Sequence, residues 1–181
     1  MEDRQYYNLL AVRAVHDPQA FSELYDVYFP RVYNFLFSRC QNVAMADDLT
    51  SETFEKMFTK LGQYDPAKGA FSTWLFRIAT NTLTDAFRRN HDAAVDFDDI
   101  APTLKTKETP EQLMLVGEDA RDLIAAVNQL KERERHFVVL RYWSGLSNSE
   151  IAELEGVTAG NVAIILHRAL AKLKLFLEKT Q

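Results

Sequence analysis

The 181-residue sequence contains a single cysteine, Cys40, and no uninterrupted apolar stretch long enough to cross a bilayer. A lone cysteine excludes an intrachain disulfide and cannot by itself build a thiolate-rich zinc site, so we expect Cys40 to be a small buried hydrophobic residue. The first residues, Met1 to Gln5, lack the basic start and the apolar run of a signal peptide. These absences predict a protein that stays in the cytoplasm, with no membrane insertion.

Motifs of catalysis are also missing. The chain has no Gly-rich phosphate-binding loop, no nucleophile motif and only four histidines. His91-Asp92 is similar to a dipeptide of some metal hydrolases, and Asp96-Phe97-Asp98-Asp99 is rich in carboxylates. Both lie in a segment with no rigid element to place further ligands. We therefore expect no enzymatic activity, no metal site and no cofactor.

The formal net charge of -5 is unusual for a nucleic-acid-binding protein, which normally presents a basic surface. The acidity is concentrated between Asp92 and Asp119, a segment with eight acidic residues and only two basic ones, Lys105 and Lys107. That segment carries a net charge of -6, which leaves +1 for the rest of the chain. The acidity therefore belongs to a connector, and the parts on either side of it are nearly neutral.

Helical periodicity is visible along most of the chain, and strand-like alternation is not. One helix begins at Asp17-Pro18, and Pro30 is expected to bend or divide it. A second helix runs from Ala46 to about Leu61, and a loop over 62–70 precedes a third helix over 71–89. The residues expected to face inward in the second helix are Leu49, Phe54, Met57, Phe58 and Leu61. The pattern predicts an all-α fold of two small helical modules joined by a flexible acidic linker.

Residues 146–162 have the layout of a DNA-binding helix-turn-helix. Ser147 is placed to cap a first helix, and Glu150 three residues later completes a capping box. Gly156 stands where the chain must reverse, and Thr158 is placed to cap a second helix. Apolar residues then recur at helical spacing at Val162, Leu166, Ala169 and Leu173. An ordinary helical hairpin within a bundle is the alternative interpretation.

A second polar pattern lies on the helix over 71–89. Its core spacing is followed by Leu75, Ile78, Thr82, Leu83, Ala86 and Phe87. A different face carries a stripe made of Arg77, Thr80, Asn81, Thr84 and Arg88. Arginines suit phosphates, Asn and Thr can hydrogen-bond exposed base edges, and Trp74 at the start of the helix can support an unpaired base. The alternative is a solvated helix face with Trp74 in the core.

Three sequence blocks, in this order and spacing, together resemble the extracytoplasmic-function (ECF) sigma factors of bacterial RNA polymerase. The blocks are Asp47 to Phe54, Phe71 to Asn81, and Leu130 to Arg135 running into the helix-turn-helix. The resemblance covers nearly the whole chain and implies sigma region 2 in residues 1–90, which melts and reads the minus-ten promoter element. Residues 91–110 would be the acidic linker. Residues 111–181 would be sigma region 4, which reads the minus-thirty-five element.

The resemblance also implies roles for single residues of region 2. The DNA-binding residues would be Trp74, Arg77, Thr80, Asn81, Thr84 and Arg88. Of these, Asn81, Thr80 and Arg77, with the loop before Phe71, would hold a flipped base of the non-template strand. Asp48, Glu52 and Phe54 match the helix that docks on the clamp helices of the largest polymerase subunit. The alternative for these acids is routine surface charge. The implied partners are core RNA polymerase (clamp helices and flap), promoter DNA and an anti-sigma factor that clamps across both modules.

In region 4, the resemblance implies that a recognition helix contacts the duplex. Its DNA-binding residues would be Thr158, Asn161, Ala163, Ile164, His167, Arg168 and Lys172. This helix departs from the family pattern, because Ala163, Ile165, Leu170 and Ala171 stand where relatives often carry basic residues, and we expect Ile165 to turn into the core. Each missing phosphate contact weakens affinity, so tight promoter recognition is expected to need the holoenzyme, which joins both modules.

The module core of region 4 is expected to include five large side chains, while part of the same surface meets the polymerase flap. These five are Phe137, Val138, Leu140, Tyr142 and Trp143. Two other functions fit parts of the sequence. One is a one-component helix-turn-helix regulator with a helical sensor, and the other is a protein-interaction module that titrates a transcription regulator.

Overall fold

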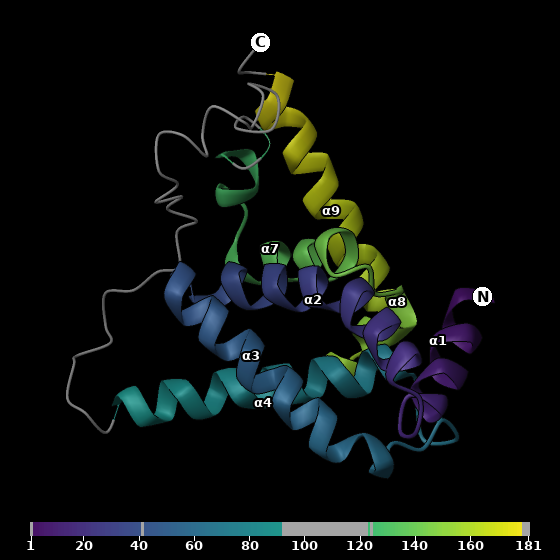
Figure 1. Ribbon diagram of the computed structural model, residues 1–181. Helices are drawn as coiled ribbons and strands as arrows, with labels where there is room; N and C mark the ends of the chain where they lie inside the picture. The colour runs from purple at the N-terminus through teal and green to yellow at the C-terminus, as the bar shows by residue number, and fades with distance from the viewer. Residues whose placement is uncertain (1, 41, 92–122, 124, 179–181) are drawn as a thin grey trace.

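The computed structural model describes residues 2–40, 42–91, 123 and 125–178 (Figure 1). All regular secondary structure in these residues is helical, which confirms the predicted fold class. The elements are α1 (Glu2–Arg13), α2 (Pro18–Cys40), α3 (Val43–Lys60), the 3-10 turn η1 (Leu61–Gln63), α4 (Phe71–His91), α7 (Glu132–Val138), the π-helical turn η2 (Val139–Trp143), α8 (Asn148–Glu155) and α9 (Ala159–Glu178). Over the same ranges, no helix has the length and apolarity needed to span a membrane.

The first module is a bundle in which α2, α3 and α4 pack on one another and α1 packs on α2 and α4. Pro30 lies inside α2 without dividing it. Leu24, Tyr28, Val32 and Phe35 are buried on either side of this proline, so tertiary packing holds the helix together where a backbone donor is missing. Cys40, at the end of α2, is half-buried.

Two helix starts in this module differ from the sequence-based expectation. The helix α1 was not expected, although Leu10 and Ala11 are its buried residues and Ala14, buried just after it, follows the same helical spacing. The helix α3 begins earlier than expected, because Asn42 caps it by accepting a hydrogen bond from the Met45 backbone N–H at 2.9 Å. These starts are set by local capping and by packing rather than by apolar residues alone.

The second module consists of α7, η2, α8 and α9. Phe137, Val138 and Leu140 are buried as expected, but Tyr142 is 54% exposed and Trp143 is 36% exposed, so the prediction that these two build the core was wrong. The π-helical turn η2 changes the spacing after Val138, and Leu146 fills the interior after the turn. The predicted acidic linker after His91, and residues 111–122 of the predicted region 4, lie outside the described residues.

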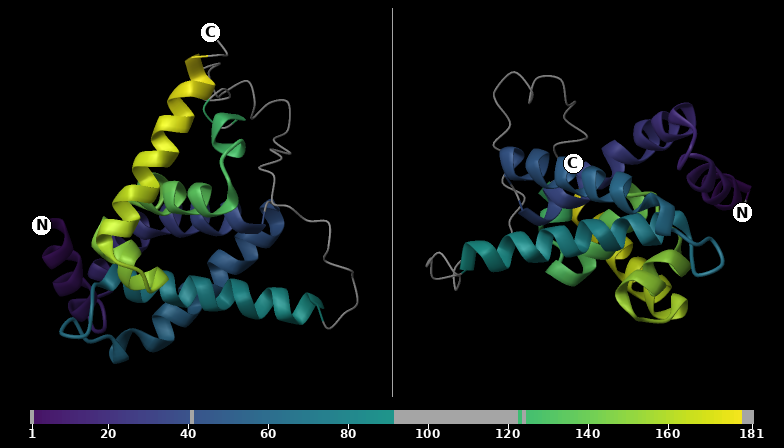
Figure 2. Two further views of the ribbon diagram at one scale, coloured as in Figure 1. Left: turned by 180° about the vertical axis from the view of Figure 1, so that it is seen from behind. Right: turned by 60° about the horizontal axis from the view of Figure 1, so that its bottom comes forward.

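The two modules pack against each other (Figure 2): α2 contacts η2, and the start of α4 contacts α8. One cluster of buried apolar side chains runs through both modules. The Phe35 ring of α2 lies 6.1 Å from the ring of His136 in α7. This packing brings the helix-turn-helix next to the start of α4. The sequence of the predicted linker gave no indication of it.

Candidate nucleic-acid interface

One face of α4 carries the polar stripe. Arg77, Asn81, Thr84 and Arg88 are exposed and Thr80 is half-buried. Thr80 Oγ1 donates to the backbone oxygen of Phe76, and Thr84 Oγ1 donates to that of Thr80, each at 2.8 Å. Because these bonds use the hydroxyl protons, the two threonines offer acceptor lone pairs, while the arginines and the Asn81 amide supply donors. The stripe therefore combines phosphate-binding cations with groups that can read a base edge.

Aromatic side chains surround the start of the stripe. Trp74 is half-buried, and its ring centroid lies 5.5 Å from that of Tyr64 and 5.8 Å from that of Phe71. Trp74, Arg77 and Asn81 are spaced i, i+3 and i+7, so they follow one line along α4. Trp74 thus belongs partly to the core and partly to the surface, and its packed side fixes the ring beside the polar groups.

The loop before α4 is held by polar contacts. The Tyr64 hydroxyl donates to the backbone oxygen of Gly69 at 3.1 Å, and burial raises the pKa of Tyr64 to about 12, so the phenol stays protonated. The Phe71 backbone N–H donates to Asn8 Oδ1 of α1 at 2.9 Å. These bonds fix the loop at the end of the stripe.

The helix-turn-helix forms as the sequence predicts. Ser147 Oγ accepts from the Glu150 backbone N–H at 3.2 Å, and Glu150 Oε2 accepts from the Ser147 backbone N–H at 2.8 Å, which completes the capping box. Gly156 ends α8 with a φ of +66°, in the left-handed region. Thr158 Oγ1 accepts from the Asn161 backbone N–H at 3.2 Å, so Thr158 caps α9.

The outer face of α9 presents most of the predicted duplex-binding residues. Thr158, Ala163, His167 and Arg168 are exposed, and Asn161 is half-buried. Ile164 is 53% exposed, while Ile165 is half-buried against the core.

Lys172 is the exception on this helix. Its Nζ binds Glu134 Oε1 of α7 at 2.6 Å and Glu134 Oε2 at 2.8 Å, so it ties α9 to α7. The helix therefore offers Arg168 as its main free cation among the predicted contacts, beside an apolar Ile164.

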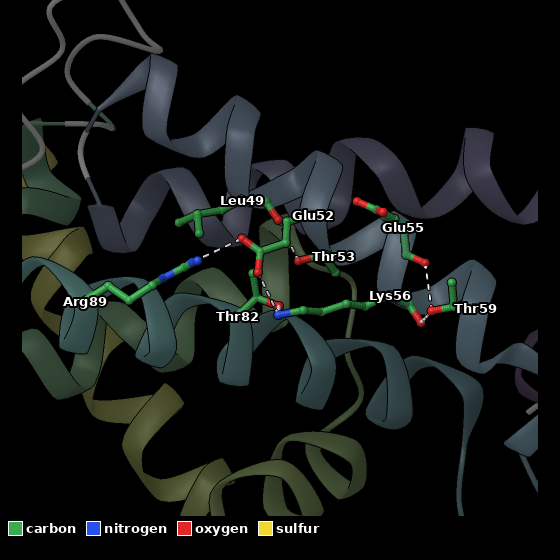
Figure 3. A network of polar contacts seen from close by, with 8 residues as sticks. All are labelled: Leu49, Glu52, Thr53, Glu55, Lys56, Thr59, Thr82 and Arg89. Carbon is green, nitrogen blue, oxygen red and sulfur yellow. Dashed lines mark hydrogen bonds and ion pairs between the residues drawn. The ribbon is translucent and has the colours of Figure 1, made fainter.

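The acids of α3 differ in their surroundings, and Figure 3 shows those of Glu52. Asp48 is exposed, whereas Glu52 is half-buried between Lys56 Nζ at 2.8 Å and Arg89 Nη2 at 3.3 Å. Lys56 Nζ also donates to Thr82 Oγ1 of α4 at 3.1 Å. The hydrogen bond from Lys56 holds the pKa of Glu52 below its usual range. Glu52 therefore joins α3 to α4 in addition to any contact that it makes with a partner.

Of the two α3 phenylalanines expected to face inward, Phe54 is buried and Phe58 is exposed. Phe54, a predicted docking residue, is 5% exposed and packs its ring 4.9 Å from that of Tyr25. Phe58, expected inside, is 66% exposed and touches Phe21 edge-on at 5.4 Å, so that expectation was wrong. The interior near α3 is already filled by Phe54 and Met57, which leaves Phe58 on the surface. Sequence periodicity missed it because Phe58 continues the apolar run of the helix.

Comparison with known proteins connects these features. Residues 24–92 match the family model of sigma-70 region 2, and residues 120–173 match that of sigma-70 region 4. The chain is 31% identical over 163 residues to the RNA polymerase sigma factor YlaC of Bacillus subtilis, an alignment that covers 88% of this chain and 92% of YlaC. It is 30% identical over 158 residues to the ECF RNA polymerase sigma factor BldN of Streptomyces coelicolor, covering 87% of this chain and 60% of BldN.

A solved structure shares the fold. It is the sigma factor RpoE in complex with the anti-sigma factor NepR from Bartonella quintana, which matches 87% of this chain and 95% of its own with a TM-score of 0.58 at 22% identity. The family models cover both modules in the predicted order, and YlaC matches over nearly its whole length. The chain therefore belongs to the extracytoplasmic-function sigma factors of bacterial RNA polymerase.

Proposed function

We propose that this sigma factor divides promoter recognition between two modules, region 2 in residues 1–90 and region 4 in residues 111–181. The carrying observation is the α4 stripe, in which Arg77 and Asn81 are exposed in line with the half-buried Trp74. Region 2 melts the minus-ten element and holds an unpaired base against Trp74. The Asn81 amide hydrogen-bonds to the base edge, the Thr80 hydroxyl oxygen accepts from it, and the arginines contact phosphates. The exposed face of α9 reads the minus-thirty-five duplex.

The polymerase-docking surface lies on the outer face of α3. Asp48, named from the resemblance, is exposed there together with Asp47, Glu55 and Phe58. An exposed aromatic ring among acids has the composition of an interface hot spot, because a large apolar contact gains most of the binding energy when surrounding polar groups exclude water. Phe54 supports this surface from beneath, and Glu52 positions α3 on α4.

The proposal extends to where the chain acts and to its regulation. Core RNA polymerase is its partner, so it works in the cytoplasm. An anti-sigma factor that clamps across both modules holds it inactive, as the complex of RpoE with NepR supports by its shared fold. A one-component regulator and a titrating module are less well supported, because both sigma-70 regions match in order.

The proposal is tested by Asn81→Ala, with Gln19→Ala as the matched control. Gln19 is an exposed amide on α2, away from the stripe. Asn81→Ala should lower open-complex formation with core polymerase about tenfold to a hundredfold, since one hydrogen bond to a desolvated base edge is worth about 1–3 kcal/mol. The permanganate reactivity of the melted thymines measures open-complex formation. Core binding should be unchanged, and the control should behave as the wild type. Normal promoter melting by Asn81→Ala would refute the assignment of the stripe.

A further inference from the structure

The loop end of the α4 stripe is covered by the first helix of the helix-turn-helix. Ser72 Oγ in the first turn of α4 hydrogen-bonds to Glu150 Oε1 of α8. In the preceding loop, a Cβ built on Gly69 would stand 2.8 Å from Oε1 of Glu153. The Glu153 carboxylate therefore lies against the bare backbone of Gly69, and a larger side chain there would push it aside. Two carboxylates of α8 therefore lie on the loop and helix start that border Trp74.

The charge on this contact has the sign of a nucleic-acid backbone. Glu150 is 8% exposed, and burial pushes its pKa upward, but hydrogen bonds from Ser147 and Ser72 outweigh burial and hold the pKa below its usual range. The carboxylate is thus ionised at the N-terminal end of α4, where the helix dipole favours a negative group. Glu150 therefore places a negative charge at the helix start that borders Trp74.

Some buried polar groups near the contact between the modules lack hydrogen-bond partners. Among the described residues, the buried side-chain polar atoms without a hydrogen-bond partner are Thr73 Oγ1, His136 Nδ1, Ser144 Oγ and Asn148 Oδ1. Thr73 lies at the start of α4, and Ser144 and Asn148 lie between η2 and α8, the elements through which the modules touch. His136 lies on α7, where its ring meets that of Phe35 of α2. An ion pair between Arg39 and Glu132 across the same contact is loose, at 3.6 Å. Each unpaired buried group costs free energy that is recovered when water reaches it.

Binding to both promoter elements requires the two modules to lie farther apart than they do in this structure. The minus-ten and minus-thirty-five elements are centred about 25 base pairs apart, which is roughly 85 Å of duplex at about 3.4 Å per base pair. A compact chain of this length has a radius of gyration of only about 16 Å. The packed modules are therefore too close together for α4 and α9 to reach both elements at once.

We propose that α8 is an intramolecular competitor of single-stranded DNA, which closes the loop end of the stripe through Glu150 and Glu153 until region 4 leaves region 2. The inference rests on the proposed function of the stripe. In the closed chain the outer face of α9 and Asn81 stay exposed, so closure blocks the entry of a base beside Trp74 without hiding the duplex-reading helix. Binding to core polymerase, which holds the two modules apart on the promoter, removes the competitor.

The test uses the double variant Glu150→Gln/Glu153→Gln. Glutamine still completes a capping box, so α8 is retained while both charges at the contact are lost. The control, Asp26→Asn/Glu178→Gln, removes the same net charge from exposed positions of α2 and α9. In a Cys40→Ala background, spin labels at the exposed positions Ser51 of α3 and Ala171 of α9 report the distance between modules by pulsed electron resonance.

A pool of fluorescein-labelled random single-stranded DNA 12-mers reports binding to the free chain by anisotropy. If the closed form holds about nine-tenths of the population, opening should tighten binding about tenfold relative to the control, because apparent affinity scales with the competent fraction. We expect the label-to-label distances in Glu150→Gln/Glu153→Gln to be longer and more broadly distributed than in the control. The double variant should also bind the 12-mers more tightly, and adding Asn81→Ala should abolish this gain in affinity.

An unchanged short distance in Glu150→Gln/Glu153→Gln, or an opened chain that binds the 12-mers no better than the control, would overturn the inference. Failure of the proposed function has a different signature. It would appear as normal promoter melting by Asn81→Ala with core polymerase, and the distance measurement does not depend on that result.

Discussion

Phe54 and Phe58 give a direct separation of fold from function, because they are the same residue type one helical turn apart on α3. Phe54 is 5% exposed and packs among Tyr25 and Phe29, whereas Phe58 is 66% exposed and has Phe21 as its ring neighbour. Truncating Phe54 to alanine removes a buried ring and leaves a cavity. Truncating Phe58 removes surface that is mostly already in water.

The expected magnitudes follow from this difference in burial. Phe54→Ala should lower the free energy of unfolding by about 3–5 kcal/mol, the range for a buried phenylalanine. Phe58→Ala should lower it by only about 0.5–1 kcal/mol, mainly through the edge contact with Phe21. If Phe58 anchors the docking surface, its loss should weaken binding to core polymerase by about 2 kcal/mol, or roughly 30-fold in Kd.

Urea unfolding followed by circular dichroism measures the first quantity, and titration of labelled chain with core polymerase measures the second. Asp26→Ala, an exposed change on α2, is the control for both. Phe58→Ala with wild-type affinity for core polymerase would refute its role as a docking anchor. A loss of stability as large as that of Phe54→Ala would refute the argument from burial.

Three further predictions concern the turn, the ion network of α3 and the recognition helix. Gly156→Ala meets no atom within 4 Å but must keep a φ of +66°, so it should destabilise the chain by about 1 kcal/mol and lower Tm by roughly 2–4 °C in a thermal melt. An unchanged Tm would contradict the backbone argument. Because the pKa of Glu52 is depressed below its ordinary 4.5 by Lys56 and Arg89, its stabilising contribution is complete above that value and disappears as pH falls through the lowered pKa. Glu52→Gln should therefore cost stability in urea at pH 7 and progressively less as the pH is lowered below 4.5, and a cost that does not change with pH would count against the ion network. Arg168→Ala should reduce the salt slope of duplex binding in holoenzyme by about 0.9 for one lost phosphate contact, and an identical slope would remove Arg168 from the phosphate-binding set.

Local signals in the sequence predicted much of the fold. The capping box of Ser147 and Glu150, the left-handed Gly156 and the cap at Thr158 form because each depends only on residues within one or two turns. The π-helical turn that exposes Tyr142 was not predictable in this way, since it depends on how Leu146 and its neighbours fill the interior. Inter-module contacts such as Ser72 with Glu150 join residues far apart in the chain, and no periodicity reports them.

In the candidate sites, too, local features were predicted from the sequence and features that depend on tertiary packing were not. The α4 stripe is exposed where helical spacing placed it, from Arg77 to Arg88. The resemblance identified Glu52 and Phe54 by their positions in the sequence. It did not predict that Glu52 bonds Lys56 and Arg89, or that Phe58 is the exposed ring of α3. Apolar residues at the edge of a helix face are ambiguous in sequence, because only the packed neighbours decide which of them is covered.

Promoter recognition by this chain is tested most directly by in vitro run-off transcription from a genomic fragment library with core RNA polymerase. We expect discrete transcripts that need both the chain and core polymerase and that start downstream of shared minus-ten and minus-thirty-five elements. These transcripts should decline with Asn81→Ala but not with Gln19→Ala. Absence of chain-dependent transcripts, or transcripts unaffected by Asn81→Ala, would contradict promoter recognition through the α4 stripe.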